Sequence, residues 1–245
     1  MRIASLSVGL ALVLAACAPQ TPTQTAPSAV TAVPAIYQAR VDTGPRGEPI
    51  DIRAVRSAYL NERTMRTEVQ YNGPEGANTI VVDPYARLLY HVHGNGMATR
   101  YGVAVGTAGR NFAGTGVIQR KAAWPSWTPT PNMVRTQPEL YAPLAGGMAG
   151  GPDNPLGSRA LYLYQNGRDT YYRIHGTLDP SSIGKATSAG CIRMFNQDAI
   201  DLYERISTGT RVVVRTQAES VRYEGQLVET PEGYVYPASQ LAQAN

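Results

Sequence analysis

Phenylalanine, cysteine and histidine are scarce in this sequence: its 245 residues include 2 Phe, 2 Cys and 3 His, against 15 Tyr. The shortage of Phe shifts aromatic burial to Tyr, whose hydroxyl needs a hydrogen-bond partner or water. Charged residues make up 16% of the chain, with a net charge of +4 and no basic run. This pattern gives no sign of nucleic-acid binding, and we expect no nucleic-acid partner.

Glycine and proline are abundant by contrast, with 24 Gly and 18 Pro. They argue for many turns and against long helices. The hydrophobic content of 43% is that of a soluble globular protein. We therefore expect one mainly β domain with few short helices.

The N-terminus carries the pattern of an export signal. Arg2 supplies a positive charge, and residues 3–14 form an apolar stretch that is too short to cross a bilayer comfortably as a permanent helix. The stretch ends in Leu-Ala-Ala-Cys, which resembles the lipobox of bacterial lipoproteins. The resemblance implies that residues 1–16 are a lipoprotein signal peptide and that Cys17 is the lipidation site; the alternative is an ordinary signal peptide in which Cys17 has no role.

A lipid on Cys17 would anchor the protein to the periplasmic face of a membrane. Ala18 follows, where lipoproteins kept in the inner membrane often carry Asp, so the outer membrane is slightly preferred. Cys191 is then the one remaining thiol, and no intramolecular disulfide can form. A single free cysteine in an oxidising compartment is a liability, so Cys191 is better explained by reactivity than by packing.

Composition divides the rest of the chain. Residues 17–45 are rich in Ala, Pro and Thr and poor in large apolar groups, which predicts a flexible linker behind the lipidated cysteine. Residues 46–78 form a lead-in segment, with a short helix possible at 54–59 and a strand beginning near 67–71. Residues 79–215 are the expected catalytic domain, and residues 216–245 are a C-terminal tail of undetermined role.

Alternating and β-branched runs predict strands in residues 79–82, 88–93, 100–105, 160–164, 171–175 and 211–215. Asn166-Gly167 indicates a hairpin turn. One helix is expected over residues 197–207, with Asn196 as its cap. The Pro- and Gly-rich residues 124–157 lack a regular pattern, which is more typical of a functional or lid-like segment than of an inert loop.

Two short motifs carry candidate chemistry. His175 closes a predicted strand, and Cys191 follows sixteen residues later. A cysteine nucleophile gains from a nearby imidazole because few thiols are ionised at neutral pH. Gly190 leaves room for an acyl group, backbone N–H groups around Gly190 and Cys191 can face an oxyanion, and Arg193 can favour a thiolate or hold a carboxylate. By residue chemistry alone, catalysis and a buried structural cysteine stand at equal weight.

Together, His-Gly-Thr at 175–177 and Ser-Ala-Gly-Cys-Ile-Arg-Met at 188–194 resemble the signature of the YkuD-type L,D-transpeptidases. The likeness runs from about residue 79 to residue 214, including Ile183-Gly184 between the motifs, Asn-Pro-Leu-Gly at 154–157 and Gly209-Thr210. The resemblance implies a YkuD-like β-sandwich catalytic domain and no cofactor. It also implies that Cys191 attacks a peptidoglycan stem peptide at its third residue, releases D-Ala and forms a thioester.

The resemblance further implies a role for each matching residue. Cys191 is the nucleophile, His175 is the acid/base, and the Gly176 carbonyl orients the histidine. The positions that shape the oxyanion hole and the substrate site are Ser188, Gly190, Arg193 and Thr177. Many relatives have His where this chain has Ala189, so any role for a second imidazole is absent here.

The acceptor that resolves the thioester stays open. A neighbouring stem gives a 3–3 cross-link, and a free D-amino acid gives exchange. A protein lysine would attach a wall-anchored protein, and water would hydrolyse the link. A non-catalytic wall-binding lipoprotein is the third hypothesis, which the intact His175 and Cys191 oppose. A papain-like protease is disfavoured because its cysteine precedes its histidine. The sequence does not determine the oligomeric state.

Other residues invite less specific interpretations. His91 and His93 have a spacing that can bind metal, but no Cys or acidic cluster lies near them in the sequence, so sheet histidines are expected and no metal site is predicted. Trp124 and Trp127 are either core residues or an aromatic wall for a sugar or peptide.

Overall fold

The computed structural model describes residue 30 and residues 32–106, 112, 114–187 and 191–243. Within these residues, eleven strands form one mixed sheet in the order β11-β7-β12-β10-β9-β8-β13-β4-β5-β6-β3. Their bounds are β3 Thr67–Gln70, β4 Ile80–Asp83, β5 Leu88–Val92, β6 Met97–Gly102, β7 Ala104–Gly106, β8 Gly114–Ala123, β9 Arg159–Gln165, β10 Arg168–His175, β11 Ala186–Thr187, β12 Ile192–Arg193 and β13 Arg211–Val214. The predicted mainly β fold with few short helices is confirmed.

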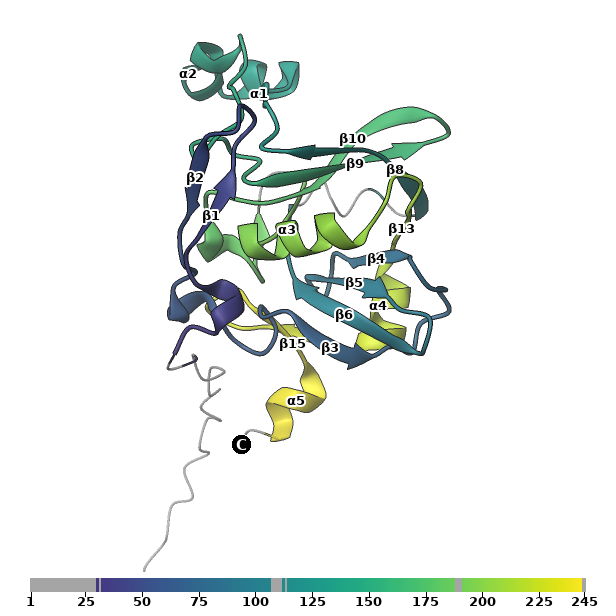
Figure 1. Cartoon of the computed structure of the whole chain (residues 1–245). Helices are drawn as coiled ribbons and strands as arrows, with labels where there is room; N and C mark the ends of the chain where they lie inside the picture. The colour runs from purple at the N-terminus through teal and green to yellow at the C-terminus, as the bar shows by residue number, and fades with distance from the viewer. Residues whose placement is uncertain (1–29, 31, 107–111, 113, 188–190, 244–245) are drawn as a thin grey trace, which may run out of the picture.

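The sheet encloses helix α3 (Asn196–Arg205). Figure 1 shows this helix between the part of the sheet formed by β8, β9 and β10 and the part formed by β4, β5 and β6. Fully buried apolar side chains from both parts meet the helix in one cluster, among them Ile80, Leu89, Ile118, Leu163 and Leu202. Burying each such side chain contributes about 1.5–3 kcal/mol, so this cluster holds the two halves of the sheet around the helix.

Strands β9 and β10 form the hairpin that carries the predicted histidine. Asn166 and Gly167 have φ values of 51° and 74°, the left-handed conformations that a type I′ turn requires. The register of the hairpin shifts between Asp169 and Arg173, which marks a β-bulge. The predicted turn is therefore confirmed, and the bulge adds an irregularity close to the end of the strand.

Strand β8 lies outside the predicted strands. It begins with Gly-Thr-Gly and contains Gln, Arg and Lys, so its apolar alternation is weak. Gly116 is needed there because a Cβ would lie 2.7 Å from the Leu163 side chain and 2.8 Å from the Tyr164 carbonyl oxygen. The antiparallel pairing of β8 with β9 and β13 places this element in the sheet despite its weak hydrophobic pattern.

The end of the expected linker is ordered, which differs from the expectation for residues 17–45. The one-turn helix η1 (Ala35–Tyr37) and strand β1 (Arg40–Thr43) precede β2 (Pro49–Ile52), with which β1 pairs. Tyr37 is fully buried against Phe195, with ring centroids 5.6 Å apart. The few large side chains of this stretch therefore suffice to dock it. The short helix expected at 54–59 is present as η2 (Ser57–Tyr59).

The residues expected as a C-terminal tail also fold onto the domain. They form α4 (Gln217–Glu224), a hairpin of β14 (Leu227–Glu229) with β15 (Val235–Pro237), and α5 (Ala238–Gln243). Thr216 and Glu219 cap α4 in a reciprocal capping box. Buried Arg87 donates to the Gly184 carbonyl at 3.2 Å and to Glu229 at 2.9 Å, which ties this hairpin to the catalytic domain.

The Pro- and Gly-rich stretch contains α1 (Pro131–Thr136), α2 (Pro138–Tyr141) and the turn η4 (Ala142–Leu144), and none of these buries a residue. Figure 1 shows them projecting at one end of the molecule, next to the β1–β2 hairpin. In the part of the chain that the structure describes, no helix has the length and apolar character needed to cross a membrane.

Candidate active site

Strand pairing brings the two predicted motifs together. β10 ends at His175 and lies parallel to β12, with Ile174 beside Ile192 and His175 beside Arg193. The Met194 N–H donates to the His175 carbonyl at 2.8 Å and extends this pairing. Cys191 immediately precedes β12 and therefore lies at the edge of the same strand pair. Cys191 therefore lies beside Arg173, two residues before His175 on β10.

His175 is held by its neighbour in the chain. Its Nδ1 lies 2.5 Å from the Gly176 carbonyl oxygen. A carbonyl can only accept a hydrogen bond, so Nδ1 carries the proton and Nε2 keeps its lone pair. Burial lowers the pKa of His175 to about 4, which hydrogen bonds to the backbone of Gly176 and Leu156 partly oppose. The imidazole is therefore neutral at pH 7 and able to accept a proton.

Cys191 is partly exposed and is a free thiol. Burial of the sulfur raises its pKa, while a hydrogen bond from the Arg173 backbone and the charges of Arg173 and Arg193 act in the opposite direction. The resting pair is thus a thiol with a neutral imidazole rather than a thiolate with an imidazolium. Such a pair needs proton transfer to the histidine as the sulfur attacks.

Arg173 is a functional candidate that the sequence did not reveal. Its guanidinium binds both carboxylate oxygens of Asp169 at 2.7 Å and lies 4.4 Å from the centre of the Tyr162 ring. The bulge between Asp169 and Arg173 contains Tyr171, which has a φ of 62° and points into solvent. A bulge beside a candidate active site re-aims side chains, and here it fixes a cation next to Cys191.

Asn196 is a second residue whose role the sequence did not reveal. It was expected to cap α3, but it is the first residue of the helix, and Phe195 occupies the cap position without a side-chain bond. Its Oδ1 accepts from the N–H groups of Ser158 at 2.9 Å and Thr177 at 3.2 Å, and its Nδ2 donates to the Thr177 carbonyl at 2.9 Å. Asn196 therefore fastens the chain that follows His175 to the start of β9.

Gly176 and Gly157 lie so close to the Asn196 side chain that no other residue type fits at these positions. A Cβ on Gly176 would lie 2.1 Å from the Asn196 Oδ1, and one on Gly157 would lie 2.3 Å from the same atom. Thr177 is buried, and its hydroxyl accepts from the Asp179 N–H at 3.0 Å. The carbonyl that orients His175 is thus part of a closely packed, hydrogen-bonded loop.

The remaining predicted site residues have different outcomes. Arg193 is adjacent to His175 in the register and partly exposed. Ser188 and Gly190 lie outside the described residues, as does Cys17. The turn at 154–157 is present: the Asn154 Nδ2 donates to the Met148 and Ala149 carbonyls at 3.3 and 3.0 Å.

The histidine pair outside the motifs has other partners. The rings of His91 and His93 are 5.2 Å apart, and the His93 Nε2 lies 2.9 Å from the Thr99 hydroxyl and 3.1 Å from the Glu68 carboxylate. Within residues 30, 32–106, 112, 114–187 and 191–243, no group of three or more His, Cys, Asp or Glu side chains could hold a metal ion.

A hollow of about 450 Å³ opens beside the loop that follows His175. One wall comes from residues 51–56 of the lead-in segment, and the other from Thr177, Leu178 and Pro180. Trp124 also lines it and is 4% exposed, with its Nε1 donating to Asp42 at 2.9 Å. Trp124 is therefore both a packed residue and part of a cavity wall.

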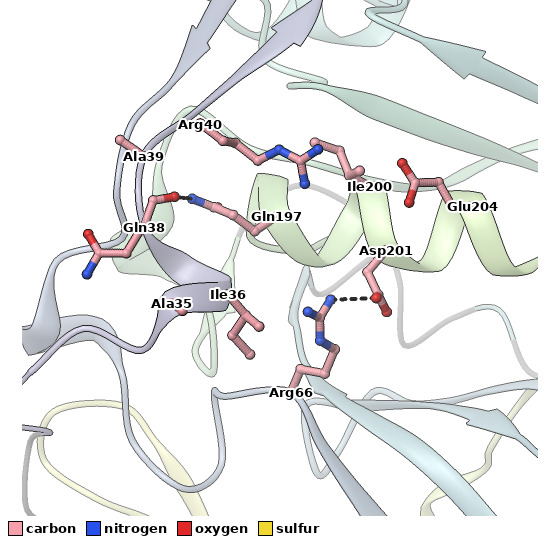
Figure 2. A pocket seen from close by; sticks show the side chains of 10 residues that line it. All are labelled: Ala35, Ile36, Gln38, Ala39, Arg40, Arg66, Gln197, Ile200, Asp201 and Glu204. Carbon is pink, nitrogen blue, oxygen red and sulfur yellow. Dashed lines mark hydrogen bonds and ion pairs between the residues drawn. The ribbon is translucent and has the colours of Figure 1, made fainter.

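A second hollow, of about 300 Å³, lies between the N-terminal elements and α3. Figure 2 shows the Gln197 amide bound to the Gln38 carbonyl, 3.4 Å away, and the Arg66 guanidinium paired with Asp201 at 3.0 Å. Asp198 is fully buried close to these groups and accepts from the Tyr37 hydroxyl at 3.1 Å. These contacts describe how the N-terminal elements are held rather than a reactive site.

Comparison with known proteins gives consistent sequence matches. The model of the YkuD family, the L,D-transpeptidase catalytic domain, matches residues 77–214. A probable L,D-transpeptidase of Escherichia coli, YbiS, is 35% identical over 155 residues, which cover 62% of this chain and 42% of that protein. A protein of Fuscovulum blasticum, named as a putative L,D-transpeptidase in the ATP synthase subunits region, is 34% identical over 144 residues, which cover 57% of this chain and 70% of the relative.

Among solved structures, a probable carnitine operon oxidoreductase from Brucella melitensis is 47% identical, with a TM-score of 0.45 over 64% of this chain and 98% of that one. An L,D-transpeptidase from Mycobacterium smegmatis is 18% identical, with a TM-score of 0.41 over 56% of this chain and 58% of that one. The chain spans less than half the length of the E. coli protein it matches, 42%.

Proposed function

Because the chain belongs to the L,D-transpeptidase catalytic domain family, we propose that it acts on peptidoglycan stem peptides and joins them through a thioester on Cys191. The observation that carries this proposal is the bond between the His175 Nδ1 and the Gly176 carbonyl, on the strand beside Cys191. It leaves the Nε2 of a neutral imidazole free to take a proton. No aspartate is then needed to orient the histidine.

The first half-reaction is acyl transfer to sulfur. The Cys191 sulfur attacks the carbonyl of the third stem residue while its proton moves to His175. A carbon–sulfur bond forms, and the bond from this carbonyl carbon to the nitrogen of D-Ala breaks. The proton on His175 passes to the leaving amine, so D-Ala departs with a neutral nitrogen and the thioester remains.

The second half-reaction consumes an amine. The amine of another stem attacks the thioester and gives a proton to His175, a carbon–nitrogen bond forms, and the bond to sulfur breaks. The proton returns to the thiolate. The backbone N–H groups of Gly190 and Cys191 are proposed to hold the oxyanion in both steps. Ser188, Arg193 and Thr177 are proposed to shape the substrate site. The product is a 3–3 cross-link, or an exchanged terminal residue when a free D-amino acid is the acceptor.

Two features outside the described residues belong to the same proposal. Residues 1–16 serve as a lipoprotein signal peptide, and lipid on Cys17 anchors the enzyme at the periplasmic face of a membrane, with the outer membrane preferred. This location would bring the catalytic domain to its peptidoglycan substrate. A wall-anchored protein is the alternative acceptor in this proposal.

Intact-protein mass spectrometry tests the reaction. The domain is incubated with a muropeptide that carries a tetrapeptide stem. The expected result is an adduct on Cys191, together with a muropeptide dimer whose mass is that of two tetrapeptide muropeptides less one D-Ala. Cys191→Ser, the matched control, should form neither. A hydrolysed monomer would move the assignment to a carboxypeptidase, and no reaction of a thiol shown to be free would contradict the proposal.

A further inference from the structure

We propose that the buried Arg87 is a positioning residue for Cys191, and that it acts through the short strand β11, which precedes the cysteine in the chain. This inference rests on the proposed function and extends it to residues 215–245, which follow the matched family region, 77–214. The reaction needs the Cys191 sulfur at a fixed distance from the His175 imidazole. A network of contacts outside both motifs holds the chain that leads to this sulfur.

Strand β7 pairs with the chain on both sides of the cysteine. On one side it pairs with β11, through Ala186 and Thr187. On the other side it pairs with β12, which begins directly after Cys191. Only residues 188–190 lie between β11 and Cys191 in the sequence, and consecutive Cα atoms are about 3.8 Å apart. A shift of β11 is therefore passed to the cysteine over a short length of chain.

Strand β11 gains little support from its own pairing. It has two residues and lies at the edge of the sheet, with β7 as its one neighbour among the described strands. Its position depends on Gly184, whose N–H donates to the Val103 carbonyl at 3.1 Å and whose carbonyl accepts from the Arg87 guanidinium at 3.2 Å. A Cβ on Gly184 would lie 2.9 Å from the side chains of both Thr64 and Tyr234, so this residue is closely enclosed.

Arg87 is unusual in both its burial and its backbone conformation. It is 2% exposed and has a φ of 58°, in the left-handed region that long side chains seldom adopt. Its carbonyl accepts from the Val103 N–H at 3.0 Å, so its backbone and its guanidinium both bind the chain next to β7. Burying a guanidinium is unfavourable unless it is well hydrogen-bonded, and the backbone conformation adds strain. A need to fix Gly184 accounts for a strained, buried cation at this place.

The C-terminal hairpin supplies the other half of the network. Arg87 binds the Glu229 carboxylate on β14 at 2.9 Å and the Gly233 carbonyl in the turn before β15. The Lys185 Nζ lies 4.9 Å from the centre of the Tyr234 ring. The two residues before β11 are thus held between Arg87 and a hairpin that lies outside the matched family region. This contact gives the hairpin a role in positioning the nucleophile.

A double-mutant cycle tests the proposal, because it separates positioning from overall stability. A carbapenem serves as the acyl donor, and its rate of acylation of Cys191 is measured at pH 7, below the unfolding temperature of every variant. The proteins are the wild type, Arg87→Met, His175→Ala and the double variant. A displacement of about 1 Å can cost about 100-fold in rate. We therefore expect His175→Ala to cost about 100-fold in the wild type but only about tenfold after Arg87→Met.

Arg215→Met is the matched control. Arg215 is also buried, and it also joins the C-terminal segment to the domain, through Asp83 at 3.3 Å and Glu224 at 3.1 Å. These ion-pair partners lie far in the sequence from the cysteine segment. The effects of Arg215→Met and His175→Ala should therefore multiply in full. A reduced cost of His175→Ala in this control as well would show that the loss of any buried cation disturbs the site, and would overturn the specific role of Arg87.

Tyr234→Ala provides a second variant that does not depend on removing a buried charge. Tyr234 is partly exposed in the hairpin, so its loss should leave the fold intact. Since its ring encloses Gly184, we expect the cost of His175→Ala to fall to about 30-fold in this background. If neither Arg87→Met nor Tyr234→Ala reduced the cost of His175→Ala, the proposal would be wrong.

A substrate readout separates this inference from the proposed function. With a tetrapeptide-stem muropeptide as donor, Arg87→Met should lower the maximal rate of thioester formation about tenfold and leave the half-saturating concentration within about twofold. A change confined to the half-saturating concentration would assign Arg87 to substrate binding and overturn its positioning role. Absence of the thioester in the wild type would count against the proposed function, whereas the carbapenem cycle would still decide the role of Arg87.

Discussion

At the scale of single residues, the acylation of Cys191 with His175 as its base is predicted to have an unusual pH dependence. Because the pKa of His175 is lowered to about 4, its neutral form predominates above that pH. The rate at which a carbapenem acylates Cys191 should therefore persist at pH 5 and fall only as the pH approaches 4. An imidazole with an ordinary pKa would lose its base near pH 6.5. An inflection at that higher pH would contradict the proposed environment of His175.

Replacing His175 should change both the shape of the pH–rate profile and the acylation rate at neutral pH. In His175→Ala, acylation depends on direct ionisation of a thiol whose pKa is raised by burial, so the rate should climb with pH through the neutral range. At pH 7 we expect a loss of about 100-fold or more, the usual contribution of a general base. His93→Ala, a histidine bonded to Thr99 and distant from the motifs in sequence, is the control and should match the wild type.

Arg173 and Asp169 make an opposed pair of predictions. Arg173→Met removes a cation that lowers the pKa of the Cys191 thiol, so that pKa should rise. Asp169→Asn removes the carboxylate that neutralises the same guanidinium, so the pKa should fall. The pH dependence of iodoacetamide alkylation measures both directions. Shifts of the same sign in the two variants would show that they act through the fold rather than through charge.

At the scale of elements, the N-terminal segment docks on α3 through a buried carboxyl group. Burial raises the pKa of Asp198 to about 7, and its contact with Arg66 at 3.6 Å only partly offsets this. A raised folded-state pKa contributes stability that is fully present below pH 3.8 and is lost as the pH rises through 7. The size of this contribution is on the order of 4 kcal/mol, from about 1.4 kcal/mol per pH unit.

Asp198→Asn should remove that loss, because the amide resembles the protonated acid and does not ionise. We expect the variant to gain free energy of unfolding relative to the wild type as the pH rises from 4 to 8, measured by urea denaturation. His175 acts in the opposite direction: its lowered pKa removes stability as the pH falls from 6.5 towards 4. Because both proteins contain His175, its contribution cancels when the free energy of unfolding of the wild type is subtracted from that of the variant. A difference that does not change with pH would contradict the prediction.

The site and the fold differ in how far the sequence could predict them. His175, Gly176 and Cys191 were predictable because their chemistry is carried by a short motif. Arg173 and Asn196 were not, because their roles depend on which strand lies beside which: Arg173 meets Cys191 through the parallel pairing of β10 with β12. Alternation predicts that a strand exists, but it does not predict that strand's neighbours in the sheet.

The same reasoning applies to whole elements. Strand β8 has a weak pattern and is placed by its pairing with β9 and β13, which are distant in the sequence. The docking of residues 35–43 depends on Tyr37 finding Asp198, 161 positions away in the sequence. The small number of large side chains predicted a linker there. Composition gives the number of apolar residues, but it does not show that a single one of them, Tyr37, has a buried site on the domain. Long-range contacts of this kind are the part of the fold that local sequence patterns do not contain.

At the scale of the whole molecule, the proposed lipid anchor sets where the enzyme can act. Val30 already packs against the buried cluster that contains Tyr37, so the proposed tether is the chain between Cys17 and residue 30. At about 3.3–3.6 Å per residue, a segment of roughly 13 residues spans at most about 47 Å. Cys17→Ala should move the protein from the membrane pellet to the soluble periplasm when cell fractions are compared by immunoblot. Cys191→Ser removes the other cysteine and should stay in the membrane fraction. If Cys17→Ala also stayed there after cleavage of residues 1–16, checked by the mass of the protein, the membrane contact would have to come from the folded domain itself, and the lipoprotein proposal would fail.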